Sequence, residues 1–308
     1  MTVTSSSPVS PPALGLLLDV DGPIASPVSR SLAIPSISID LAWLANAGVP
    51  VIFNTGRSDA FIREQVVPQM LAAGLDAGVR IYAICEKGAA WFTFTRDGVD
   101  ELTVDESLAM PGDHRIAMRE LVDARYSKYM FFDETKRAMV SLEQQLDVPN
   151  SEYLAVQPEF DAEVIADLQG RGFGVIRGTN RYPDAAGEIQ FRCDPTIIST
   201  DIESVRLGKD LGAERAFELL EGPLPVAWRT VGDSRSDYAM ADWLHAHGHE
   251  VAHVDVRPSE GIPEKPYAVL TAGELIHDEA GAAFLRRWTQ LVGGEASDER
   301  NVGIGDGS

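Results

Sequence analysis

The stretch Leu14-Gly-Leu-Leu-Leu-Asp-Val-Asp-Gly-Pro23 joins an apolar run to two carboxylates that are one residue apart. A run of this kind is typical of a strand that is buried on both faces of a parallel sheet. Asp19 and Asp21 therefore come where a central strand ends, which is the edge where open α/β sheets bind ligands. Taken alone, the Asp-Val-Asp-Gly segment fits a polar turn equally well. Two close carboxylates repel each other, so the pair needs a cation or a shared proton.

The composition narrows the classes of function. With 308 residues the chain has room for two domains, and its 44% apolar and 24% charged residues are ordinary for a globular protein. The formal net charge of −21 argues against nucleic acid or an anionic membrane as the main partner, because both reward basic patches. We therefore expect no nucleic acid and no membrane among the partners. The oligomeric state stays open.

The cysteines and the ends of the chain give four further expectations. Cys85 and Cys193 are too few and too far apart for a disulfide framework or a zinc site, so we expect reduced core thiols in a cytoplasmic protein. Residues 1–12 are rich in Ser and Pro without a basic start, which predicts a flexible arm and not a signal peptide. Residues 293–308 are rich in Gly, Asp and Ser, which predicts a disordered tail.

Strands and helices alternate in two parts of the chain, residues 13–88 and 196–292. This alternation predicts an α/β fold with a doubly wound, mainly parallel, Rossmann-like sheet. Between the two parts, residues 89–195 predict an inserted α+β domain that opens with a hairpin around Arg96-Asp-Gly98. A helix within it is expected over residues 158–169, with proline at its first position.

Four polar motifs follow one another along the chain: Asp19-x-Asp21, Thr55-Gly56-Arg57, Lys209 and Gly232-Asp233-Ser234-Arg-Ser236-Asp237. If all four belong to one parallel sheet, they meet at its carboxyl edge. Their four aspartates would then be crowded together, and unpaired buried negative charge is prohibitively costly. A divalent cation resolves the crowding. Carboxylates, water and a phosphate oxygen suit Mg²⁺, and no neighbouring His or Cys favours zinc.

In this order, from about Leu14 to Leu291, the motifs resemble those of the haloacid dehalogenase superfamily of aspartyl-nucleophile phosphohydrolases. The insert between the second and third motifs resembles a type II cap domain. Its element order is most similar to subclass IIB, the Cof-like group with sugar phosphatases and phosphomannomutases. The segment Cys85-Glu-Lys-Gly-Ala-Ala90 resembles the lead-in to the cap of that group, with Lys87 where Asn is common.

The resemblance implies a Mg²⁺-dependent phosphatase that acts on a small phosphorylated metabolite, with a sugar or polyol phosphate as the expected class. It implies that Asp19 is the nucleophile that forms an aspartyl-phosphate. Asp21 would protonate the leaving oxygen and then take a proton from the attacking water. Thr55 and Gly56 would bind a phosphoryl oxygen, and Lys209 would neutralise the transferring group.

The resemblance also implies a metal site. Mg²⁺ would be held by Asp19, by the backbone carbonyl of Asp21 and by Asp233. Asp237 and Ser234 would support that site without binding the ion directly.

The chain departs from the pattern of the superfamily at three places. Pro23 stands where Thr is usual, Ser236 replaces a frequent Asn, and Lys209 is followed by Asp-Leu-Gly and not directly by Gly. None of these changes removes an acid, a nucleophile or a metal ligand, so we expect turnover to survive. The third motif is the weakest of the four.

Other charged residues have a functional and a structural interpretation. Arg57, Arg177 and Arg181 are candidate substrate contacts, but arginines late in the insert, including Arg171 and Arg192, can also offset neighbouring carboxylates, and we favour this second explanation. Four histidines between residues 245 and 253 suggest a metal tract, yet their spacing across a helix end and a strand start favours a surface or packing role.

Two alternative functions stay open. One is a phosphomutase of the phosphomannomutase type, whose phosphoryl-enzyme must outlast reorientation of the substrate. The other is a non-catalytic phospho-regulatory module, because receiver domains also combine acidic residues, Thr and Lys on a doubly wound sheet. An insert of about a hundred residues argues against the second alternative unless it shields a site from water.

Overall fold

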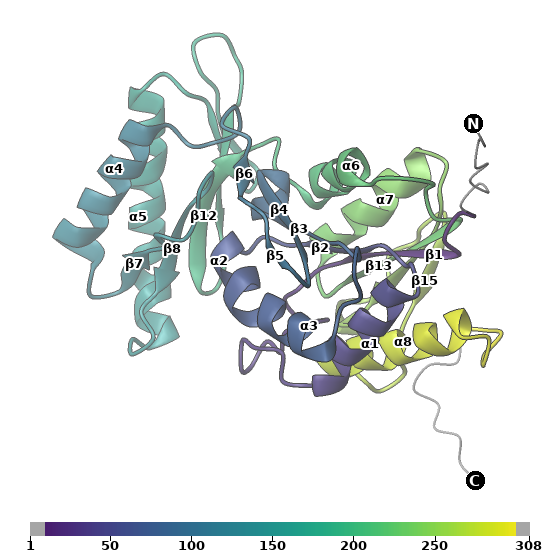
Figure 1. Cartoon of the computed structure of the whole chain (residues 1–308). Coiled ribbons are helices and arrows are strands. Elements are labelled where there is room, and N and C mark those ends of the chain that lie inside the picture. Colours follow the sequence, from purple (N-terminus) through teal and green to yellow (C-terminus); the bar gives the residue numbers. More distant parts are fainter. Residues whose placement is uncertain (1–9, 300–308) are drawn as a thin grey trace.

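The computed structural model describes residues 10–299, which form two β-sheets with helices packed on them (Figure 1). The larger sheet has nine strands in the order β15-β14-β13-β1-β2-β3-β4-β5, with β6 paired to β4. The strands from β15 to β3 are all parallel, which confirms the predicted α/β fold. The bounds of these six strands are β1 (Leu14–Leu18), β2 (Val51–Asn54), β3 (Ile81–Cys85), β13 (Ala227–Gly232), β14 (Glu250–Asp255) and β15 (Ala268–Leu270).

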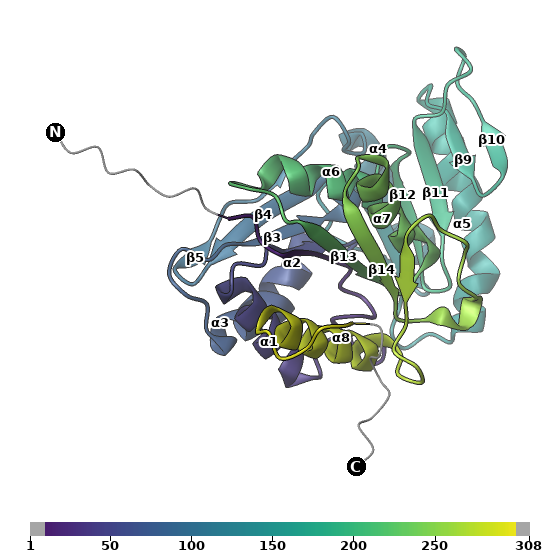
Figure 2. The same ribbon diagram turned by 90° about the vertical axis from the view of Figure 1, so that its right-hand side faces the viewer.

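Helices cover both faces of this sheet, as Figure 2 shows. One face carries α1 (Pro35–Asn46), α3 (Val67–Ala73) and α8 (His277–Val292), and the other carries α6 (Lys209–Leu219) and α7 (Tyr238–Ala246). Alternate residues of β1 therefore pack into different cores. Leu16 and Leu18 belong to the cluster with α1 and α8, whereas Leu17 belongs to the cluster with α6 and α7. This double burial explains the unbroken leucine run.

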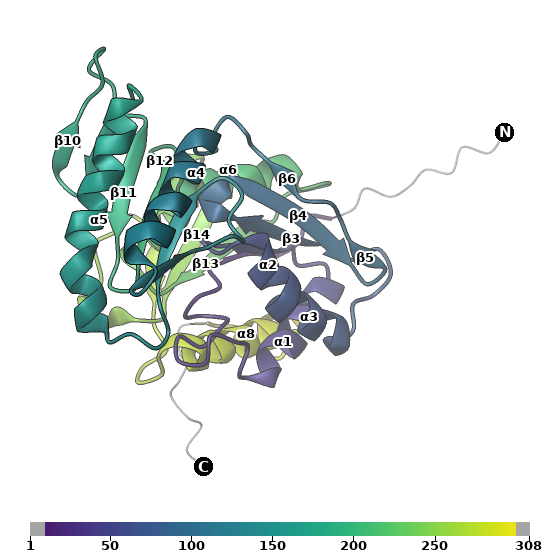
Figure 3. The ribbon, with the colours of Figure 1, turned by 90° about the vertical axis from the view of Figure 1, so that its left-hand side faces the viewer.

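The second sheet has six strands in the order β10-β9-β11-β12-β8-β7. Helices α4 (Gly112–Leu121) and α5 (Asn150–Gly170) lie on its side away from the larger sheet (Figure 3). Tyr153 and Phe160 of α5 are fully buried in a separate hydrophobic core there. The strands of this sheet are β7 (Met130–Phe132), β8 (Val140–Gln144), β9 (Val175–Arg177), β10 (Asn180–Tyr182), β11 (Phe191–Pro195) and β12 (Ser199–Ser204).

The predicted boundaries of the insert, residues 89 and 195, differ from the sheet pairing. Strands β4 (Ala90–Thr95), β5 (Gly98–Val99) and β6 (Thr103–Val104) belong to the nine-stranded sheet, because the chain turns back tightly after β3 and pairs with it. Strand β12 lies beyond residue 195 but pairs with β8 and β11 in the smaller sheet. The alternation of polar and apolar residues identifies a strand but not the sheet that it joins.

The helix predicted over residues 158–169 is longer than expected. α5 begins at Asn150, and Pro158 lies inside it and not at its first position. A proline inside a helix removes one backbone hydrogen bond. Tyr153 and Phe160 are buried on either side of Pro158 in the chain, and this packing holds the helix together through the proline.

The two ends of the chain are only partly described. Residues 293–299, predicted to be disordered, fold back on the larger domain: the Glu299 carboxylate accepts hydrogen bonds from Arg229 Nε at 2.8 Å and from Trp288 Nε1 at 2.9 Å. The remainder of the predicted tail, residues 300–308, and residues 1–9 of the predicted arm lie outside the described residues. Within the described part, no helix is both long and apolar enough to cross a membrane.

The histidines between residues 245 and 253 pack against aromatic rings. His247 stacks on Trp243 with ring centroids 4.0 Å apart, and the His249 ring lies 4.7 Å from that of Phe217. His253, on β14, is fully buried, and its Nδ1 shares a hydrogen bond of 2.7 Å with Thr230 Oγ1. Both cysteines are buried and free, as predicted.

We expect His253 to make the fold sensitive to acid. Burial lowers the pKa of His253 from 6.5 to about 4, so the unfolded chain takes up the proton first as the pH falls. The stability that the neutral ring contributes is therefore complete above about pH 6.5 and is lost progressively toward pH 4, by up to about 3 kcal/mol. His253→Gln should flatten the dependence of the unfolding free energy on pH in this window, measured by urea denaturation. The exposed His245→Gln is the control, and equal slopes for wild type and His253→Gln would contradict the prediction.

Candidate functional site

The four predicted motifs meet at the carboxyl edge of the nine-stranded sheet. Asp19 follows β1, Thr55 follows β2 and Asp233 follows β13, and these three strands are neighbours in the sheet. The Asp19 N–H donates to the Val231 carbonyl at 2.9 Å, so the end of β1 is fixed beside β13. The parallel register thus brings together segments that are more than two hundred residues apart in sequence.

The Lys209 ammonium lies at the centre of this edge. Its Nζ is 2.6 Å from Asp19 Oδ1, 2.7 Å from Asp237 Oδ1 and 2.8 Å from the Asn54 carbonyl. A lysine at the first position of a helix opposes the helix dipole, and here three oxygens compensate for it. The third motif, which was the weakest in the sequence, therefore lies within contact of the first and the fourth.

Asn54 is a residue of the site that the sequence analysis missed. Its Nδ2 donates to the Lys209 carbonyl at 2.9 Å, so Asn54 and Lys209 bond each other through both backbone and side chain. A Cβ on Gly212 would lie 2.0 Å from Asn54 Oδ1, so only glycine lets α6 approach this closely. In the sequence, the feature that could have identified Asn54 is that it is a polar residue at the end of the otherwise apolar strand β2.

One ammonium cannot compensate the charge of all the buried carboxylates. Burial raises the pKa of Asp19 well above its usual value, although Lys209 acts against this rise. Burial also disfavours ionised Asp237, but Lys209 and Ser234 outweigh it and lower the pKa of Asp237. One ammonium thus contacts two buried carboxylates, and an ionised Asp19 needs further positive charge.

Asp237 organises the loop that carries Asp233. Its Oδ2 accepts hydrogen bonds from the Asp233 N–H at 3.2 Å, from the Ser234 N–H at 2.9 Å and from Ser234 Oγ at 2.7 Å. This loop touches the turn after β1, because a Cβ on Gly22 would lie 2.7 Å from the Asp233 Cβ. Gly22 also has a φ of +91°, which glycine adopts without strain.

The aspartates fit a hard divalent cation. Asp19, Asp233 and Asp237 each offer an oxygen, and these oxygens lie within 4.8 Å of one another. Both oxygens of Asp237 already bind Lys209 or the loop, so Asp19 and Asp233 are the better ligands. Burial, and then Asp237, raise the pKa of Asp233 to about 6, which again indicates missing positive charge. All-oxygen ligands of this kind suit Mg²⁺.

Asp21 and Arg57 form an ion pair beside this cluster. Arg57 Nε is 2.9 Å from Asp21 Oδ2, and Arg57 Nη2 is 2.8 Å from Asp21 Oδ1. The Asp21 side chain is 41% exposed, in contrast to the buried Asp19. The two carboxylates of the first motif therefore have different environments, as two different chemical roles require.

A cavity of about 360 Å³ opens beside this ion pair, between the two sheets. The larger domain contributes Asp21, Gly22, Arg30, Gly56, Arg57 and Asp233 to its lining, and the insert contributes Ser141, Glu143, Thr196, Ser199 and Asp201. Burial, and then Asp133, raise the pKa of Glu143. We call this cavity the interdomain cleft.

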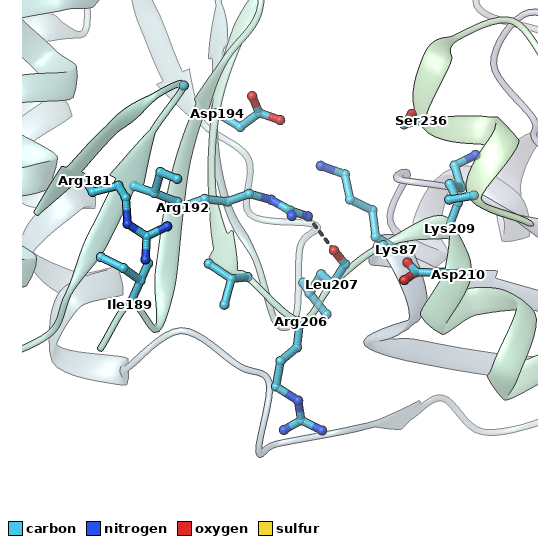
Figure 4. A pocket seen from close by; sticks show the side chains of 15 residues that line it. Lys87, Arg181, Ile189, Arg192, Asp194, Arg206, Leu207, Lys209, Asp210 and Ser236 are labelled. Carbon is cyan, nitrogen blue, oxygen red and sulfur yellow. Dashed lines mark hydrogen bonds between the residues drawn. The ribbon is translucent and has the colours of Figure 1, made fainter. Parts of the chain in front are cut away.

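Arg177 and Arg181 do not line the interdomain cleft, so the structure separates them from the other candidates. Arg177 Nη2 is 2.7 Å from the buried carboxylate of Asp161. Arg181 lines a different cavity, of about 760 Å³, near Arg192 and Lys87 (Figure 4). There Lys87 Nζ lies 2.8 Å from the buried Glu203, to which Arg192 is also bonded. Arg177, Arg192 and Lys87 offset carboxylates of the insert, which agrees with the structural interpretation.

No family model matches the chain, and no curated protein matches it. Among solved structures, the C-terminal domain of trehalose-6-phosphate phosphatase from C. albicans is similar, with a TM-score of 0.62 at 12% identity over 93% of each chain.

Two further solved structures are similar to this chain. A haloacid dehalogenase-like hydrolase from Bacteroides thetaiotaomicron has a TM-score of 0.53 at 10% identity, over 89% of this chain and 98% of that one. The IMP-nucleotidase from Plasmodium falciparum has a TM-score of 0.53 at 10% identity, over 94% of this chain and 64% of that one. At these identities the similarity shows the fold alone, and this fold agrees with the one that the resemblance implied: the chain folds like a haloacid dehalogenase-like hydrolase.

Proposed function

We propose that the protein is a Mg²⁺-dependent phosphatase of small phosphorylated metabolites, a phosphoric monoester hydrolase of the haloacid dehalogenase superfamily. The observation that carries the proposal is the Lys209 ammonium between Asp19 and Asp237, with Asp233 beside them. A buried carboxylate next to a fixed cation, with room for a second cation, is suited to attack on phosphorus. The insert then serves as a type II cap of the Cof-like kind over the site.

The chemistry proceeds in two steps. The Asp19 carboxylate attacks phosphorus and forms an aspartyl-phosphate while the ester oxygen leaves, and water then hydrolyses this intermediate. Lys209 holds Asp19 in place and offsets charge on the transferring group, and Thr55 and Gly56 hold its oxygens. Mg²⁺, held by Asp19, Asp233 and the carbonyl of Asp21, supplies charge neutralisation when it is bound.

Asp21 is the acid for the leaving oxygen and then the base for water. In the structure both oxygens of Asp21 accept hydrogen bonds from Arg57, and a carboxylate held in this way is not free to turn toward a leaving oxygen. Entry of the substrate into the interdomain cleft therefore has to separate the two side chains. Arg57 is then free to bind the anionic substrate, which is the role proposed for it from the sequence.

The lining of the interdomain cleft supports a sugar or polyol phosphate. The insert presents hydroxyls and carboxylates, among them Ser141, Glu143, Ser199 and Asp201. Carboxylates accept hydrogen bonds from substrate hydroxyls and repel a second anionic group. A monophosphate with a neutral, hydroxyl-rich body fits this surface better than a polyanion.

Replacement of the nucleophile should abolish turnover. We expect Asp19→Asn to lower kcat by about 10³-fold or more, because no covalent intermediate can form. Phosphate release from a panel of phosphorylated metabolites, with Mg²⁺ and with a chelator, is the measurement. Asp194→Asn, an acid outside the interdomain cleft, is the matched control. Full activity of Asp19→Asn, or unchanged activity in the chelator, would contradict the mechanism.

The carboxylate of Glu143 should matter for the organic part of the substrate. Glu143→Gln should raise KM for the phosphate ester of an uncharged sugar by about tenfold. The reason is that a charge-assisted hydrogen bond to a sugar hydroxyl is replaced by a weaker one. Glu134→Gln, an exposed acid of the insert that is paired with Arg119 and does not line the interdomain cleft, is the control. Equal KM values for the wild type and Glu143→Gln, across several sugar phosphates, would show that Glu143 does not bind the substrate.

The same assays separate the two alternatives. A phosphomutase would convert one phosphorylated isomer into another in a bisphosphate-dependent reaction, without release of phosphate. A regulatory module would take up at most one phosphate per chain, without further turnover.

A further inference from the structure

Lys136 is a cationic residue of the insert whose ammonium reaches the second motif. Its Nζ donates to the Gly56 carbonyl at 2.6 Å, across eighty residues of sequence. The side chain is only 7% exposed. Burying a lysine ammonium costs free energy unless hydrogen bonds or opposite charges compensate it.

The peptide between Gly56 and Arg57 is held at both ends. Lys136 binds its carbonyl oxygen, and its N–H donates to Thr55 Oγ1 at 3.1 Å. Since the Thr55 oxygen accepts this bond, its own hydrogen is directed elsewhere and is available to a phosphoryl oxygen. The orientation of this peptide therefore restricts the directions in which the Thr55 hydroxyl can donate.

The segment that carries Lys136 is itself fixed on the larger domain. The buried Glu86 carboxylate, at the end of β3, accepts the N–H groups of Arg137, Ala138 and Met139 at 2.7 to 2.9 Å. Thr135 Oγ1 and Ser58 Oγ share a hydrogen bond of 2.7 Å. These contacts hold residues 135–139 against the loop that begins with Thr55, so Lys136 is positioned by its neighbours on both sides.

We propose that Lys136 is a positioning residue of the phosphate site, supplied by the insert. It fixes the Gly56 carbonyl and thereby the Thr55 hydroxyl that binds the phosphoryl group. This inference rests on the proposed function, because Thr55 binds phosphate only if the site is a phosphatase site. It assigns to the insert a part in phosphate binding that is separate from recognition of the organic part of the substrate.

The test uses inorganic phosphate as the probe and the full chain. Lys136→Met keeps the length of the side chain and removes its charge and donors, and we expect the inhibition constant of phosphate to rise and kcat/KM to fall, each by about tenfold. Lys136→Gln, which retains a donor, should lose less. Lys128→Met removes an exposed lysine of the insert that is paired with Glu152 and does not contact Gly56, and both values should change less than about twofold.

A double-mutant cycle separates positioning from general stability. In a Thr55→Val background, Lys136→Met should have little further effect on phosphate inhibition, because the hydroxyl that it orients is gone. Additive losses, equal losses in Lys128→Met and Lys136→Met, or unchanged phosphate inhibition in Lys136→Met would overturn the inference. Failure of the wild type to release or bind phosphate would instead overturn the proposed function.

Discussion

The structure of the site depends on one buried ammonium shared by three oxygens. Lys209 joins the end of β1, through Asp19, to the loop after β13, through Asp237, and to the end of β2, through the Asn54 carbonyl. Removing a buried charge of this kind leaves its partners uncompensated, which is far more costly than losing an exposed ion pair. The geometry at the edge of the sheet is therefore set by charge as much as by hydrophobic packing.

The carboxylates at the edge of the sheet carry more charge than the neighbouring cations compensate. A chain with a net charge of −21 places a lysine and an arginine next to its most crowded aspartates, yet Asp19 and Asp233 still have raised pKa values, both chiefly because of burial. At this site the negative charge of the aspartates therefore exceeds the positive charge of the neighbouring side chains. A protein that binds an anion at such a place needs a cation to arrive with it or before it.

The sequence allowed the parallel sheet and its polar edge to be predicted because both follow from local patterns: a leucine run for a buried strand, and motifs at strand ends. It did not reveal that β4 joins the larger sheet, because an extended segment has the same period of two in either sheet, and no strand was predicted where β12 lies. Asn54 and Lys136 were missed for a related reason, since their partners are the carbonyl oxygens of residues 209 and 56, and no side-chain pattern marks a carbonyl. Arg181 was a candidate by charge alone, and charge does not tell which cavity a side chain enters.

The contact between the Glu86 carboxylate and residues 137–139 also limits how such a protein can be re-engineered. Glu86, Lys87 and Gly88 have successive φ values of 49°, 56° and 99°, a rare left-handed run for two residues with side chains. This turn aims one carboxylate at three adjacent amides of the insert. A foreign insert grafted onto the catalytic sheet would have to present three matching amides at the same place, or leave a buried acid without partners. The larger domain and the insert are therefore not interchangeable modules. In a chimera, the turn Glu86–Gly88 and residues 135–139 have to come from the same parent protein.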